Sequence, residues 1–149
     1  MIEQTPRQRA NTLEALNVMW PSVPPENVAE RLAFYRDRQA LGRRDSPPDC
    51  GTVACFGGWC AWWPTFRAQG VFAGDTGSPQ TKQSIRTDRG AFVVSEFLFG
   101  YSEMFTAAGF HPADPKRNWK GVMPRGVSDH EIVTRRLKWV LENSRVVRS

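Results

Sequence analysis

Apolar residues recur every three or four positions in several stretches of the chain, and this spacing is typical of one face of a helix. The C-terminal stretch shows the pattern most clearly. Ser128 and Glu131 have the spacing of a capping box, which marks a helix start, and the pattern continues to about Asn143. The apolar residues of this predicted helix are Ile132, Val133, Leu137, Val140 and Leu141. We expect them to face a hydrophobic core.

A second helix is predicted near the N-terminus. Thr5 is a residue type that often caps helices, and Pro6 is favoured in a first turn because the N–H that it lacks has no partner there. The helix should end at Pro21. Its apolar side would consist of Leu13, Leu16 and Trp20.

The same spacing predicts further helices. One runs from the proline pair at 24–25 to about Leu41, and another ends just before Gly100. The apolar residues of the latter include Phe92, Val93, Phe97 and Leu98. A short helix over 102–108 would turn Met104 and Phe105 inward.

The segment 50–63 reads CGTVACFGGWCAWW and contains all three cysteines and three of the six tryptophans. If Thr52 caps a helix that runs to Trp63, the helix is apolar on two neighbouring faces. One face carries Phe56, Cys60 and Trp63, and the other carries Cys55, Trp59 and Trp62. Because a helix that is apolar all round is buried, we expect this helix at the centre of the core.

Two stretches lack a helical pattern. Residues 69–89 are rich in Gly, Ser, Thr, Asp and Gln, and we expect a long surface loop whose start is anchored by Val71 and Phe72. Long loops of this kind are often functional, which makes 69–89 a candidate interaction element. Residues 111–127 are rich in proline and basic groups and are expected to form a second loop.

Strand-like alternation is scarce, and no internal repeat is present. The sequence therefore predicts a mostly α-helical fold, a compact single domain of five or six helices with long loops. The domain should span residues 1–149, with frayed ends at 1–4 and 144–149.

Composition agrees with one domain, because 149 residues of which 40% are hydrophobic can bury a core. No secretory signal or apolar run of about 20 residues is present, so we expect a cytoplasmic protein with no membrane partner. The net charge is +5, and sixteen of the twenty basic residues are Arg. This excess favours anionic partners such as nucleic acids or acidic proteins.

Two segments resemble a known group of proteins. CGTVACFGGW resembles the C-G-T-x-x-C-x-x-G segment of small proteins from bacteriophages and their bacterial hosts, which also tend to carry a downstream segment like FLFGYSEMFTAAGF. No activity is attached to that group, so the resemblance implies a phage or prophage setting. Cys60 and the tryptophans around it lie outside the shared pattern.

The cysteines leave several kinds of chemistry open. Zinc could bind Cys50, Cys55 and Cys60 with His111 or His130 as fourth ligand, although five helical residues rotate by about 140° and turn successive cysteines apart. Cys50 before a helix could be a reactive thiol with a histidine as base. Buried structural thiols, or a disulfide in an oxidising compartment, are the other interpretations.

No phosphate-binding glycine motif or paired carboxylates are present, and no cofactor is predicted. The loop PKRNWKGVMPR instead combines cations with a tryptophan that could stack on a base. The predicted binding residues are Arg117, Trp119, Lys120 and Arg125 in this loop and Arg135 and Arg136 on the last helix.

The pattern therefore favours a non-enzymatic interaction protein that binds a host or viral protein or nucleoprotein complex. An inhibitor of a host defence system and a virion accessory protein are two examples. The alternatives are direct nucleic-acid binding through the Arg/Lys/Trp loop, and a small cysteine-dependent enzyme or zinc-binding module.

Overall fold

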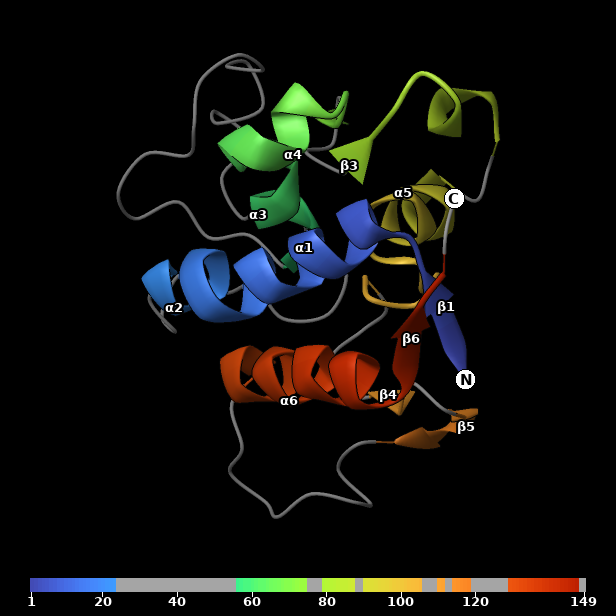
Figure 1. Cartoon of the computed structure of the whole chain (residues 1–149). Coiled ribbons are helices and arrows are strands. Elements are labelled where there is room, and N and C mark those ends of the chain that lie inside the picture. The colour runs from blue at the N-terminus through green and yellow to red at the C-terminus, as the bar shows by residue number, and fades with distance from the viewer. Residues whose placement is uncertain are drawn as a thin grey trace.

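Helix α1 (Pro6–Glu14) contacts both α5 (Gly90–Phe99) and α6 (Asp129–Glu142). In the computed structural model α1 crosses in front of α5, α6 runs below it, and α3 and α4 lie above it (Figure 1). The structure describes residues 1–23, 56–74, 79–87, 90–105, 110–111, 114–118 and 129–147. The predicted mostly helical fold is confirmed in these residues. The helix predicted over 24–41 lies outside them.

The predicted start of α1 is confirmed. The Thr5 hydroxyl accepts a hydrogen bond from the Gln8 amide (3.2 Å), and the Gln8 side chain accepts one from the Thr5 amide (2.8 Å), which together form a capping box. The helix continues as a π-helical turn (Ala15–Met19) and ends in α2 (Trp20–Ser22), one residue beyond Pro21.

The predicted apolar side of this helix is correct at Trp20, which is fully buried, and wrong at Leu13, which is 41% exposed. In a straight α-helix two residues seven positions apart share a side. The intervening π-helical turn holds more residues than an α-turn, so it rotates Leu13 away from the side that Trp20 occupies.

The apolar cysteine segment forms the core helix that its sequence predicts, within the residues that the structure describes. Helix α3 (Phe56–Trp62) buries Phe56, Cys60 and Trp62, and Pro64 then begins a separate helix, α4 (Pro64–Ala68). Phe56 contacts three aromatic rings at centroid distances of 5.1–5.8 Å, those of Trp20, Phe99 and Phe105. The central position predicted for this segment is therefore confirmed.

The two ends of the chain pair with each other. Strands β1 (Ile2–Gln4) and β6 (Ser144–Val146) form a two-stranded parallel sheet, so the predicted fraying is wrong for these residues (Figure 1). Gln4 stabilises the pairing of β1 with β6, because its buried side chain accepts a hydrogen bond from the Ser144 hydroxyl (3.1 Å).

The segment predicted as a structureless loop contains short elements. Strands β2 (Phe72–Ala73) and β3 (Pro79–Gln80) pair in antiparallel fashion, and a 3-10 turn, η4 (Ser84–Arg86), follows. Val71 anchors the start of the segment in the core, as predicted. Strands β4 (Phe110–His111) and β5 (Asp114–Asn118) also pair in antiparallel fashion, and all of their residues except Phe110 belong to the other predicted loop.

Residues 101–105 form turns and not the first part of the helix predicted over 102–108. The backbone amide of Met104 donates to the Ser95 hydroxyl (3.0 Å), which itself donates to the Tyr101 carbonyl (2.5 Å). The Ser95 hydroxyl thus satisfies backbone groups of Tyr101 and Met104 that would otherwise bond within a helix, which favours the turns. Met104 and Phe105 are nevertheless buried, as predicted.

The C-terminal end of α5 is held by side chains from residues 4–11. The last carbonyls of a helix lack backbone partners, and here each of the four carbonyls of residues 96–99 accepts a hydrogen bond from one of these side chains. The pairs are Gln8 with Glu96 (3.0 Å), Arg7 with Phe97 (2.9 Å), Asn11 with Leu98 (2.9 Å) and Gln4 with Phe99 (2.7 Å). We call this set of four bonds the α5 clamp.

Gly100 ends α5 in a left-handed conformation (φ 72°), and its amide donates to the Glu96 carbonyl (2.8 Å). The side chain of Gln8, which belongs to the clamp, and strand β1 lie close to Gly100. A Cβ at this position would lie 2.9 Å from the Gln8 side-chain oxygen and 3.0 Å from the Glu3 carbonyl oxygen. Both the conformation and the space therefore require glycine.

Replacing Gly100 with Ala should lower the free energy of unfolding by about 2–4 kcal/mol, because left-handed strain adds to the close contact with the clamp. Gly70→Ala is the matched control, since Gly70 also has positive φ (102°) but has no atom within 4 Å of the added Cβ. It should cost about 1 kcal/mol. Urea unfolding of both variants measures the difference, and equal costs would contradict the close packing of β1 on Gly100.

Candidate interaction surface

The predicted basic loop is described only in part. Arg117 belongs to β5, whose backbone pairs with β4, whereas Trp119, Lys120 and Arg125 lie outside the described residues. The structure therefore does not test whether these four residues share a surface. Their role in binding stays a prediction.

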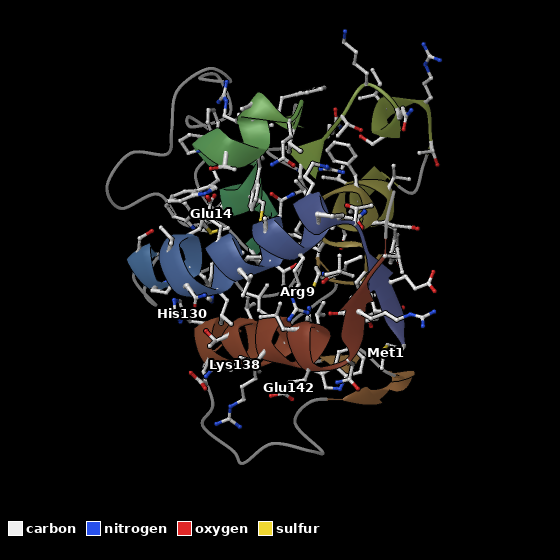
Figure 2. The ribbon with its side chains drawn as sticks, viewed as in Figure 1. Met1, Arg9, Glu14, His130, Lys138 and Glu142 are labelled. Carbon is white, nitrogen blue, oxygen red and sulfur yellow. The ribbon has the colours of Figure 1, made fainter. Side chains whose placement is uncertain are left out.

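The exposed side of α6 is not uniformly basic. Arg135 forms an ion pair with Glu131 at 3.0 Å, and both side chains are partly exposed. Lys138 and Glu142 are exposed one and two turns further along the same helix (Figure 2). Two cations and two carboxylates share this side, so α6 adds little net charge to the predicted basic surface.

Arg136 is not a surface residue, and its predicted binding role is wrong. Its side chain is completely buried, and the guanidinium donates to the Met104 carbonyl oxygen (3.3 Å). Arg136 lies one helical turn from both Ile132 and Val140, which are also buried, so its position on the helix turns it inward. It fastens the 101–105 turn to α6.

Arg135 and Arg136 should consequently respond differently to truncation. Arg136→Ala leaves a buried carbonyl without its donor and removes side-chain volume, which should lower the free energy of unfolding by about 2–4 kcal/mol. Arg135→Ala removes an exposed ion pair and should cost less than about 1 kcal/mol. Chemical denaturation of the two neighbours tests this, and a folded Arg136→Ala variant of unchanged stability would refute its buried role.

Tyr101 lies beside this buried arginine. Its hydroxyl donates to the Glu103 carboxylate (3.0 Å), and its ring contacts that of Trp139 at a centroid distance of 5.9 Å. Burial raises the pKa of the Tyr101 phenol, and the hydrogen bond to Glu103 and the negative charge of Glu103 raise it further, while Arg136 opposes them. The phenol therefore stays protonated at pH values where an exposed tyrosine ionises.

The raised pKa predicts how stability changes with pH. In the unfolded chain the phenol ionises near its ordinary pKa of about 10, whereas the folded protein keeps the proton, so stability is lost as pH rises above about 10. Tyr101→Phe should remove this component of the pH dependence. Urea unfolding between pH 8 and 11 compares the two proteins, and parallel profiles would contradict the assignment. Absorbance at 295 nm should show one late-titrating phenol that the variant lacks.

The residues considered for metal or thiol chemistry are not brought together in the described structure. Cys60 is buried in the core cluster, Cys50 and Cys55 lie outside the described residues, and only the backbone of His111 is described. Among the residues that are described, no three His, Cys, Asp or Glu side chains form a group that could hold a metal ion.

His130 is packed against Trp20. Its ring stacks on the indole at a centroid distance of 4.8 Å, and its Nε2 donates to the Trp20 carbonyl oxygen (3.0 Å). The indole N–H in turn donates to the His130 carbonyl oxygen (2.9 Å). The described contacts of His130 thus fasten the start of α6 to α2 (Figure 2).

A surface that the sequence analysis missed lies on α5. This helix reads GAFVVSEFLF, with a single charged residue in ten. Phe92 is nevertheless 43% exposed, and Val93 and Phe97, which lie about 100° and 140° from it around the helix axis, are partly exposed. The sequence of α5 indicates this surface, because a helix that lacks a polar side leaves apolar residues exposed wherever its neighbours do not cover it.

The turn η4 packs beside the start of α5 and adds to this surface. A Cβ at Gly90 would lie 3.4 Å from the Ser84 carbonyl oxygen, which shows how closely the two elements approach. Ile85, the next residue, is 58% exposed. Ile85, Phe92, Val93 and Phe97 are the large apolar residues that these two adjacent elements leave exposed or partly exposed, and we call them the α5–η4 face. Its η4 part belongs to the segment predicted as a candidate interaction element.

Comparison with family models, curated proteins and solved structures finds no match for the chain. Within the described ranges, none of the helices combines the length and the apolar character that crossing a bilayer requires.

Proposed function

We propose that the protein is a non-enzymatic interaction protein that binds a host or viral protein through the α5–η4 face. The observation that carries this proposal is the exposure of Phe92 on a helix with almost no polar residues. Large apolar side chains that gather on adjacent surface elements are typical of protein interfaces. Aromatic side chains in particular supply much of the binding energy of such contacts.

The setting proposed is a phage or prophage gene whose product acts in the host cytoplasm. The C-G-T-x-x-C-x-x-G segment supports it through its resemblance to phage-associated proteins. An inhibitor of a host defence complex is the concrete form of this proposal, and a virion accessory protein is another within the same class. The basic loop with Arg117, Trp119, Lys120 and Arg125 is a proposed second contact to the same assembly.

Binding should depend on the α5–η4 face and not on exposed apolar residues in general. The test compares Ile85→Ser/Phe92→Ser with Leu13→Ser/Val18→Ser. The two pairs are matched in exposure, since Ile85 and Phe92 are 58% and 43% exposed and Val18 and Leu13 are 56% and 41% exposed. Tagged full-length proteins are expressed in bacterial cells, and recovered partners are quantified by mass spectrometry.

The amount of a specific partner recovered with Ile85→Ser/Phe92→Ser should fall at least about tenfold, because each apolar contact contributes about 1.5–3 kcal/mol. The control variant should retain that partner. Melting temperatures of both variants should stay close to that of the wild-type protein, since all four side chains are exposed. Recovery of the same partners by all three proteins would reject the α5–η4 face as the binding site.

A further inference from the structure

The charges around the α5–η4 face are predominantly positive. Lys82 and Arg86 are exposed on either side of Ile85 along the chain. Arg7 is exposed at the other margin, where its guanidinium lies 4.2 Å from the centre of the Phe97 ring. Among the described residues of these elements, Glu96 is the exposed carboxylate. Three cations therefore flank the apolar residues, and the one carboxylate lies one helical turn from both Phe92 and Val93.

Charges elsewhere on the described surface are more nearly balanced. On α6, Arg135 and Lys138 share a side with Glu131 and Glu142. At the paired chain ends, Arg145 contacts Glu3 at 2.6 Å. The excess of cations beside exposed apolar side chains thus distinguishes the α5–η4 face from these other regions.

We infer that the partner of the α5–η4 face is a protein segment that combines acidic side chains with apolar anchors. The inference rests on the proposed function and names its partner class. Complementary charge at the rim steers association, while apolar contacts at the centre supply affinity.

Two other partners for this face, a second copy of the chain and a nucleic acid, fit it less well. A second copy of the chain would bring the same cations and a net charge of +5 against each other, which disfavours association. A nucleic acid would match the cations, but its phosphate backbone offers no aliphatic surface to Ile85 and Val93. An acidic, amphipathic protein segment matches both parts of the face.

The probe is a displayed library of random 16-residue peptides selected on immobilised full-length protein in low salt. Counter-selection on Ile85→Ser/Phe92→Ser removes peptides that bind elsewhere. The peptides that remain should carry net negative charge together with Leu, Phe or Trp. Fluorescence anisotropy with labelled copies should show affinity that falls as salt is raised, because added ions screen the exposed charges.

Charge reversal then tests the acidic class directly. Lys82→Glu/Arg86→Glu should weaken the selected peptides at least tenfold. Lys138→Glu/Arg145→Glu changes the net charge equally but away from the face, and it should weaken them less than threefold. Circular dichroism confirms folding of each variant, and Lys82→Gln/Arg86→Gln replaces the reversal if that variant does not fold.

The outcomes separate the two proposals. If Ile85→Ser/Phe92→Ser abolishes binding while both charge reversals act equally, the face binds proteins but the acidic class is wrong. If no peptide survives counter-selection, both the face and the class are rejected. Face-dependent dimerisation in sedimentation, or face-dependent binding of a 20-nucleotide DNA strand or duplex, would also overturn the assignment to an acidic protein.

Discussion

The α5 clamp is the interaction on which the arrangement of the described helices depends. Its four donors come from residues 4–11, and the same short segment reaches two other parts of the fold. Asn11 exchanges hydrogen bonds with Gln69 just beyond α4, and Arg9 donates to the Leu141 carbonyl near the end of α6 (3.1 Å). The same stretch of chain thus holds the ends of α5 and α6 through their backbone carbonyls, and the residue that follows α4 through its side chain.

This constraint explains why the chain ends are ordered. Gln4 is fully buried, and it satisfies its amide group by donating to Thr12 and Phe99 and by accepting from Ser144. A buried amide that lacked these partners would be costly, so the position of β1 is determined by hydrogen bonds as well as by apolar packing. Strand β6 then pairs with an element that is already fixed.

Local signals explain which parts of the fold were predictable. The N-cap at Thr5 and the apolar face of α6 are specified by residues within one or two turns of each other, and the sequence predicts both. The parallel pairing of Ile2 with Ser144 joins residues from opposite ends of the chain, and three-residue strands carry no readable alternation. Arg136 could have been placed correctly, because it shares a face with Ile132 and Val140. The charge of an arginine favours an exposed position, whereas its helical spacing here favours a buried one.

The candidate site also depends partly on local sequence and partly on contacts between distant residues. Positive charge can be read directly from a sequence, and it predicts the binding residues in the loop around Trp119. Exposed apolar surface depends instead on how much of a helix its neighbours cover. The clamp fixes the C-terminal end of α5, whereas Phe92 near its start is 43% exposed although η4 contacts the helix. A surface whose backbone is held in place before binding loses less conformational freedom when a partner binds, so the clamp would favour binding at the proposed α5–η4 face.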